Sequence, residues 1–260
     1  MMKRESAWRR VVAGACVCAR ASAAALLLGA CAEEEAGDVR VAWNPGGSKV
    51  AVGMKETGLV DELADTIAQT FELPSDLTIV HKECGVENAF YDPKTRQIVM
   101  CYDLLDVVAE VAWDDAKKDV KKYQETLVAT WTSFVFHELG HALIHLYDLP
   151  VTGREEDAAD DFSTVLMIKR QRAGKAILAA KYWANADPET YSKLAYAGDH
   201  SLDAQRFYRI ICLVYGSSAD AYRKLVDLDV LTESRAAQCP GEYQKALRSW
   251  ETLLDGRVKD

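Results

Sequence analysis

Two histidines and a glutamate within the segment 136–143 have a spacing that suits metal chemistry. In His137-Glu138-x-x-His141 the histidines are four residues apart, so a helix would present both imidazoles on one face to a single metal ion. Glu138 would lie beside the metal, where a carboxylate can take a proton from a bound water. Neutral imidazole suits zinc, and a hydrolytic zinc site has three protein ligands and one open position. The sequence must therefore supply a third ligand elsewhere.

An acidic cluster after this motif offers the third ligand. Glu156 and Asp160 are four residues apart, so a helix that begins here places both carboxylates on one side. Glu156 would then bind the metal, while Asp160 would accept the second N–H of a ligand histidine. Glu155 and Asp157 are the alternatives. Glu155 lacks such an acidic partner four residues further on, and the side chain of Asp157 is shorter.

Hydrolysis of a peptide bond also needs a group that stabilises the oxyanion formed when water attacks the carbonyl. His200 is the candidate, because it follows an aspartate that would orient it and lies where a helix is expected to begin. The alternative for His200 is a surface histidine beside a serine cap, and Arg206 is a second candidate donor. His145 lies four residues beyond His141 but, like His81, is expected to be structural.

The elements that would position these residues change in character along the chain. Periodicity before the motif predicts strands at 39–43 and 78–80, a helix at 60–71, and a hairpin with arms at 88–91 and 97–102. Helix formers dominate from 113 to 147, and the part around the motif is apolar on most faces, which is typical of a buried helix. The remainder predicts helices at 156–169, 175–184, 188–196, 201–213, 218–226 and 243–254. This order predicts an α+β fold with a small β-containing N-terminal lobe and a mainly helical C-terminal lobe.

The N-terminus has the pattern of an exported protein. Basic residues precede the small and apolar run 21–30, which is too short to cross a bilayer and is typical of a signal peptide. Leu28-Gly29-Ala30-Cys31 resembles a bacterial lipobox, in which the cysteine becomes the lipid-modified first residue, and an ordinary secretory signal is the alternative. We expect a signal peptide at 1–30, a tether at 31–38 and one domain at 39–260, anchored to a bacterial membrane and facing the periplasm or the exterior.

Charge and cysteine usage agree with this location. The 260 residues carry a formal charge of −9, of which residues 1–30 contribute +4, so the remainder carries −13. That balance argues against nucleic acid as a partner. Four cysteines follow Cys31, and an oxidising compartment allows them three pairings. We expect the pairs that close short loops, Cys84–Cys101 and Cys212–Cys239.

The motifs in combination resemble a known group of enzymes. His137-Glu138-x-x-His141 followed by Glu156-x-x-x-Asp160 is similar to the thermolysin-type zinc peptidases, the gluzincins, in which the second glutamate is the third zinc ligand and the aspartate steadies a ligand histidine. Asn88-Ala89-Phe90-Tyr91 is similar to the edge strand that binds the substrate backbone in that group. The stretch 84–162 also resembles a bacterial family of metallopeptidases of unknown function, many of them exported. The resemblance implies a zincin-like fold.

The resemblance also implies an activity. It predicts a peptidase with one zinc ion, held by His137, His141 and Glu156, that acts on a peptide or protein substrate lying along the edge strand. Glu138 would be the general base, and zinc-bound hydroxide would attack the peptide carbonyl. The opposing hypothesis is a catalytically inactive zinc-binding lipoprotein that serves binding or assembly in the cell envelope. It predicts zinc without turnover, so a change at Glu138 separates the two hypotheses.

Overall fold

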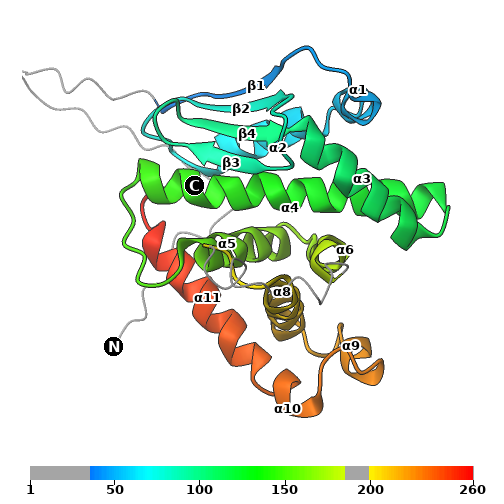
Figure 1. Ribbon diagram of the computed structural model, residues 1–260. Helices are drawn as coiled ribbons and strands as arrows, with labels where there is room; N and C mark the ends of the chain where they lie inside the picture. The colour runs from blue at the N-terminus through cyan, green and yellow to red at the C-terminus, as the bar shows by residue number, and fades with distance from the viewer. Residues whose placement is uncertain (1–35, 185–198, 260) are drawn as a thin grey trace, which may run out of the picture.

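A small sheet and a group of helices lie on opposite sides of one long helix, α4 (Val120–Leu146) (Figure 1). This computed structural model describes residues 36–184 and 199–259. The predicted α+β class is confirmed, because strands are confined to the N-terminal part and helices make up the C-terminal part. The predicted signal peptide, Cys31 and the predicted helix at 188–196 lie outside the described residues.

The sheet contains four strands in the order β1-β2-β4-β3. Their bounds are β1 (Val39–Trp43), β2 (Leu77–Lys82), β3 (Ala89–Asp92) and β4 (Gln97–Cys101). β1, β2 and β4 run parallel, whereas β3 pairs antiparallel with β4 and forms the predicted hairpin. The branched and sulfur-containing residues of β4 are buried, which suits an inner strand. β3 is left as an edge strand of the sheet.

The helices before the motif depart from the sequence-based prediction. α2 (Leu59–Thr70) was expected, but α1 (Lys49–Glu56) was not. The stretch 113–147, in which helix formers dominate, is divided between two helices, because α3 (Tyr102–Ala116) ends before α4 begins. Lys117 and Lys118 have φ of 50° and 68° and turn the chain between the two helices. Both residues are good helix formers, so composition conceals the break.

The helices after the motif lie on the other side of α4, where α5 and α6 pack directly against it. They are α5 (Glu155–Lys169), α6 (Ala173–Ala184), α8 (Asp203–Ser217), α9 (Lys224–Asp227), α10 (Glu233–Ala236) and α11 (Cys239–Leu253). The helix predicted at 218–226 is wrong, since most of this segment is in turns. Some of its backbone hydrogen bonds join residues only three apart: Leu225 N–H donates to the Tyr222 carbonyl at 2.9 Å, and Val226 N–H donates to the Arg223 carbonyl at 2.9 Å. Such bonds reach back three residues, tighter than an α-helix allows.

Two disulfides connect elements that are close in sequence, as predicted. Cys84–Cys101 joins the segment after β2 to the end of β4, and Cys212–Cys239 joins α8 to the start of α11. α8 and α11 approach so closely here that a Cβ on Gly216 would lie 2.2 Å from the carbonyl oxygen of Cys239. Glycine is therefore required at this crossing, because any side chain would overlap the neighbouring backbone.

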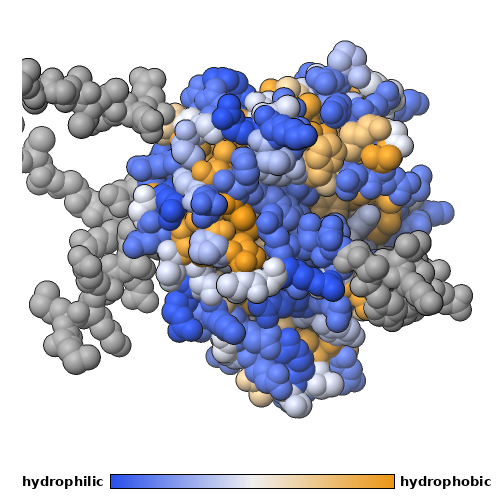
Figure 2. Space-filling model, turned by 60° about the vertical axis from the view of Figure 1, so that its left-hand side comes forward, coloured by the Kyte–Doolittle hydropathy of each residue, from blue (hydrophilic) through white to orange (hydrophobic). Residues whose placement is uncertain are grey.

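The core surrounds α4, and the surface is mainly hydrophilic. Trp131, Val135, Phe136 and Leu139 of α4 are at most 1% exposed, because the sheet covers one side and α5 and α6 cover the other. Figure 2 shows one face of the molecule, on which hydrophobic side chains form patches between hydrophilic ones. Within residues 36–184 and 199–259, no helix has the length and apolar character that crossing a membrane requires.

His81 is a buried histidine of this core, far in sequence from the motif. It is fully buried in β2, its ring stacks on Trp43 at 3.9 Å between centroids, and its Nε2 accepts a hydrogen bond from Trp131 Nε1 at 3.3 Å. Burial lowers the pKa of His81 from 6.5 to about 3. The imidazole is therefore neutral in the folded protein and supports the sheet.

We predict that His81 makes the fold sensitive to acid. Between pH 6.5 and about 3 the unfolded chain binds a proton at this residue while the folded protein does not, so the free energy of unfolding falls as the pH falls. The contribution is about 1.4 kcal/mol per pH unit. His81→Gln keeps an acceptor for Trp131 and does not titrate. Denaturant unfolding across this window should show the wild type losing stability relative to the variant as the pH falls, and a difference independent of pH would contradict the prediction.

Candidate metal centre

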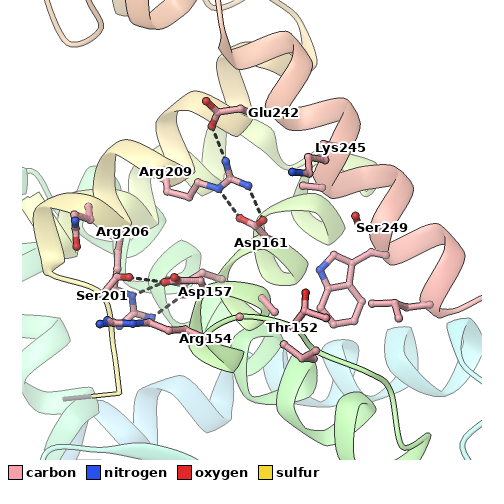
Figure 3. Close-up of a pocket in the computed structure, with 18 of the residues that line it drawn as sticks. Thr152, Arg154, Asp157, Asp161, Ser201, Arg206, Arg209, Glu242, Lys245 and Ser249 are labelled. Atoms are coloured by element: carbon pink, nitrogen blue, oxygen red, sulfur yellow. Dashed lines mark hydrogen bonds and ion pairs between the residues drawn. The ribbon is translucent and has the colours of Figure 1, made fainter. Parts of the chain in front are cut away.

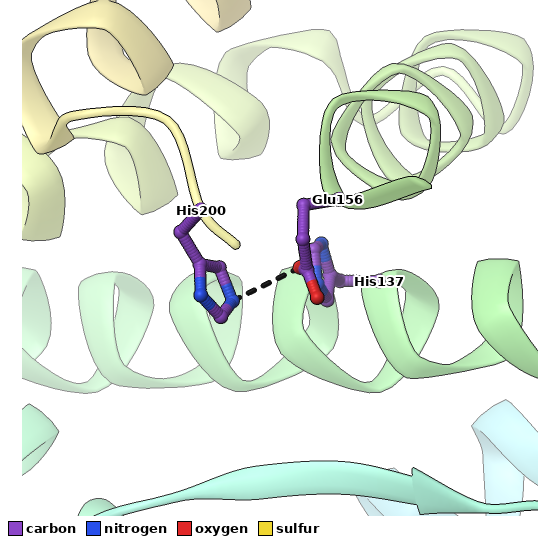
Figure 4. A group of neighbouring side chains, drawn as sticks. All are labelled: His137, Glu156 and His200. Atoms are coloured by element: carbon purple, nitrogen blue, oxygen red, sulfur yellow. Dashed lines mark hydrogen bonds and ion pairs between the residues drawn. The ribbon is translucent and has the colours of Figure 1, made fainter. Parts of the chain in front are cut away.

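Three histidine nitrogens meet at one carboxylate oxygen above α4. α4 supplies His137 and His141, α5 supplies Glu156 from its first turn, and His200 precedes α8. Figure 4 shows His200 and Glu156 pointing toward each other, with His137 beside Glu156. Glu156 Oε2 lies 2.9 Å from His200 Nε2, 3.1 Å from His137 Nε2 and 3.4 Å from His141 Nε2. The structure therefore brings together all the residues that the sequence predicts at the metal.

The spacing of these atoms suits a metal ion. His137 Nε2 and His141 Nε2 are 3.2 Å apart, and both are 3.1–3.4 Å from Glu156 Oε2. Nitrogen and oxygen ligands about 2.0–2.2 Å from a tetrahedral zinc ion are separated by about 3.3 Å. The ligand atoms of His137, Glu156 and His200 also lie within 4.8 Å of one another. The donor set thus fits a zinc-like ion in both its chemistry and its geometry.

Each histidine of the motif has a carboxylate behind it. His137 Nδ1 lies 2.8 Å from Asp160 Oδ1, and His141 Nδ1 lies 2.7 Å from Glu155 Oε1. A carboxylate can only accept here, so each Nδ1 carries the proton and each Nε2 is directed to the centre with raised basicity. Asp160 occupies the place that its spacing predicts. Glu155, the alternative third ligand, lies behind His141, a contact between two helices that spacing along one helix does not predict.

A buried arginine holds the carboxylate behind His137. Arg206 donates from Nε to Asp160 Oδ2 and from Nη2 to Asp160 Oδ1, both at 2.7 Å, and its guanidinium lies 3.7 Å from the ring centroid of Trp183. Arg206 is 6% exposed and Asp160 is 8% exposed. Burial raises the pKa of Asp160, but the arginine and His137 outweigh it and leave this pKa well below its usual range. Arg206 is committed to Asp160, which leaves His200 as the candidate oxyanion donor.

The electrostatics of the centre favour a positive charge. Burial lowers the pKa of His137, but the hydrogen bonds to Asp160 and Glu156 outweigh it and raise this pKa to about 9. Burial likewise opposes ionisation of Glu156, yet its three histidine partners hold its pKa well below the usual value. Glu138 is 6% exposed, and burial raises the pKa of its carboxyl. A divalent cation would satisfy this group of acids and imidazoles.

The glycine of the motif allows α4 and α5 to approach. A Cβ on Gly140 would lie 3.0 Å from Ala159 Cα and 3.2 Å from Ala159 Cβ. Such contacts are too short for packed carbon atoms, so a larger residue at 140 would push α5 away from α4. The separation of these two helices sets the distance from His137 to the carboxylates of α5. Gly140 therefore contributes to the geometry of the centre.

The edge strand lies beside α4 and is joined to it near the end of the helix. Ala89 pairs with Met100, and the Asn88 carbonyl accepts a hydrogen bond from Cys101 N–H at 3.2 Å. Tyr91 Oη lies 3.0 Å from His145 Nδ1, which ties β3 to the last turn of α4. His145 thus faces the sheet. Within the described residues, no hydrogen bond or ion pair joins Asn88 or Ala89 to the histidines of the centre.

Comparison with known proteins assigns the chain to a family. The profile of a family described as "Putative metallopeptidase" matches residues 43–254, which is most of the chain, and the protein belongs to this family. Membership supports a peptidase function and implies a metal ion, for which the centre above provides the candidate ligands. No match was found among curated proteins, and none among solved structures.

We predict that Glu156 and Glu155 contribute differently to metal binding. Glu156→Ala removes the oxygen at which the three histidines meet, so the protein should lose stoichiometric zinc. Glu155→Ala leaves that oxygen in place and frees His141 Nδ1, so zinc affinity should fall about 10–100-fold. Elemental analysis and titration against a chelator measure both effects. Retention of zinc by Glu156→Ala together with its loss from Glu155→Ala would reverse the two roles.

A second prediction concerns the buried arginine. Arg206→Met leaves the Asp160 carboxylate buried without its cation, which should lower the free energy of unfolding by roughly 3–5 kcal/mol. Removing both charges with Asp160→Asn and Arg206→Met should cost less than the single change, because no charge is then left unpaired. Denaturant unfolding of zinc-free protein measures these differences. A double variant less stable than Arg206→Met would show that the unpaired charge is not the cause.

Proposed function

We propose that this protein is a zinc-dependent peptidase of the gluzincin type. The observation that carries the proposal is the 3.1–3.4 Å spacing of His137, His141 and Glu156, with their Nε2 and Oε2 atoms directed at one point. A zinc ion held there would supply Lewis acidity, which activates water and polarises a peptide carbonyl. A zincin-like fold is part of the proposal, and the position of α4 between the sheet and the helices supports it (Figure 1).

Glu138 is the proposed general base. It follows His137 in α4 and is 6% exposed, so its carboxylate is held beside the ligands and largely shielded from water. It would take the proton of the attacking water and pass it to the nitrogen of the leaving amine. Proton transfer by a positioned carboxylate contributes about 10²–10⁴-fold to such reactions. The burial of Glu138 next to the ligands is the support for this role.

His200 is the proposed donor to the oxyanion. Its side chain is 55% exposed, and its Nε2 lies at the open side of the centre, 2.9 Å from Glu156 Oε2. The segment that carries it is held at two points, by Arg154 Nη1 donating to the His200 carbonyl at 3.0 Å and by Ser201 Oγ donating to Asp157 Oδ1 at 2.6 Å. A donor fixed in this way can stabilise developing negative charge without reorganising.

The substrate backbone would extend the sheet at β3. β3 is the last strand in the order β1-β2-β4-β3, so a peptide can add beside it through main-chain hydrogen bonds, starting at Asn88 and Ala89. Phe90 is 37% exposed on this strand, where it can contact a substrate side chain. The hydrogen bond between Tyr91 and His145 keeps β3 beside the helix of the metal ligands. These features support a peptide or protein as substrate.

The proposed location is outside the cytoplasm, with a lipid at Cys31 as anchor to a bacterial membrane. The described residues support it through the disulfides Cys84–Cys101 and Cys212–Cys239, since such bonds persist in oxidising compartments. The acidic balance of the residues after 30 supports the expectation that nucleic acid is not a partner.

Replacement of Glu138 tests the proposal. Glu138→Gln keeps the shape of the side chain but cannot take a proton, so cleavage of a peptide library should fall at least about 100-fold while zinc stays near one ion per chain. Glu110→Gln, at an exposed position of α3, is the matched control and should cleave like the wild type. Cleavage is read by mass spectrometry, which also reports the residues around the cut bond.

The same experiment separates the two hypotheses. Equal behaviour of the wild type and Glu138→Gln toward the library would exclude the proposed mechanism. A zinc-loaded wild type that cleaves nothing would instead favour a binding or assembly protein of the cell envelope that retains zinc without turnover.

A further inference from the structure

A cavity lies next to the metal centre, and the proposed mechanism does not use it. Its volume is about 1210 Å³, and its lining comes from the segment 150–154, α5, α8, Arg235 and α11 (Figure 3). This volume exceeds the roughly 300–1000 Å³ of a small-molecule pocket, so the cavity suits a length of chain better than a single small group. The four candidate ligands of the metal are not among its lining residues.

The acidic side chains that line this cavity already have partners. Arg209 binds Asp161 at 2.6 Å and Glu242 at 2.6 Å, and Arg235 also binds Glu242. Asp160 is held by Arg206, and Asp157 accepts from Ser201. Arginines thus compensate the charges of Asp160, Asp161 and Glu242, and only Asp157 has a neutral partner.

Three cations of the lining, in contrast, have no carboxylate partner among the residues that the structure describes. Lys245 and Arg248 are exposed on α11, and neither forms an ion pair with any residue in 36–184 or 199–259. Arg154 donates to the backbone carbonyl of His200 and likewise has no acidic partner in these ranges. The cavity is thus a positively charged region on a protein whose residues after 30 carry −13. It is suited to an anionic ligand.

The positions of these cations favour an extended ligand over a compact anion. Arg154 precedes α5 at one end of the cavity, while Lys245 extends into it from α11 at the other side (Figure 3). The lining also provides hydroxyls that can bond to a peptide main chain, those of Thr152, Ser249 and Thr252, and apolar surface from Trp250 and Leu253 that can contact aliphatic side chains. Carboxylates spaced along a peptide can reach both ends, which one phosphate-sized ion cannot.

The cavity shares part of its wall with the metal centre. Asp157 and Arg154 line the cavity, and the same two residues hold Ser201 and the carbonyl of His200. Asp160, behind His137, is also part of the wall. We propose that this cavity binds an acidic segment of a peptide, as a second contact for the substrate beside the site of cleavage. As a substrate contact it rests on the proposed peptidase function, but binding itself can be measured without turnover.

Binding of labelled peptides to the full chain carrying Glu138→Gln tests the proposal. The probes are two short fluorescein-labelled peptides, one alternating Glu and Ser and the other alternating Lys and Ser. By fluorescence anisotropy, the acidic peptide should bind at least about tenfold more tightly than the lysine peptide. Lys245→Glu with Arg248→Glu should weaken its binding about tenfold or more. Lys55→Glu with Lys224→Glu, the same change of charge at exposed positions outside the cavity, should change it less than about twofold.

Several outcomes would overturn the proposal. These are equal binding of the two peptides, equal effects of the two double variants, and complete displacement of the peptide by inorganic phosphate at constant ionic strength, which would indicate a site for small anions. If the charge-reversed protein fails to fold, Lys245→Gln with Arg248→Gln should give a loss of binding in the same direction. The binding experiment measures no cleavage, so a negative result in it does not contradict the peptidase proposal. In the same way, cleavage by Glu138→Gln would contradict the proposed mechanism without contradicting the binding of an acidic peptide.

Discussion

The cost of burying polar groups inside α4 is the constraint on which the rest of the structure depends. His137 and Glu138 are 6% exposed in a helix otherwise covered by apolar side chains. Buried polar groups without partners cost several kcal/mol in an apolar surrounding. α5 meets this cost with Asp160, and α8 in turn supplies Arg206 for Asp160. Two helices that are separate in sequence are thus fixed around α4 by the hydrogen-bonding needs of His137.

This chain of contacts gives the centre its stiffness. The guanidinium of Arg206 lies over the ring of Trp183 in α6, so the contacts that begin at His137 end on a third helix. Each member is fixed by its neighbour, which limits rotation of the imidazole of His137. A ligand that is held in place before the metal arrives loses less entropy when it binds. The packing of Gly140 against Ala159 acts in the same direction, because it fixes the distance between α4 and α5.

Much of the centre could be predicted from the sequence because its main residues are paired at the spacing of one helical turn. The pairs His137/His141 and Glu156/Asp160 each lie one turn apart, and the structure places each pair on one face. The hairpin and the two disulfides were predictable for a similar reason, since their partners are close in sequence. Contacts across 46 residues, such as Arg206 to Asp160, leave no periodic signal and were missed. The contact of Glu155 with His141 had no such signal either, because the two residues lie on different helices.

The differences between the predicted and the observed helices also have physical causes. Lys117 and Lys118 are helix formers, yet a turn of left-handed residues separates α3 from α4 at this point. The segment after α8 has a helical composition, but only α9 retains a regular turn. In both places the local helix propensity favours a helix, but tertiary packing around the core requires the chain to turn.

The disulfide between α8 and α11 has a consequence for the metal centre, which it does not touch. Arg206 lies on the same helix as Cys212, and the bond to Cys239 closes a loop of 27 residues that ends in α11. Closing this loop restricts the unfolded chain and so favours the docking of α8. When α8 is docked, Arg206 pairs with Asp160, the residue that holds His137. Oxidation of these cysteines would therefore favour the arrangement in which His137 is positioned for a metal ion.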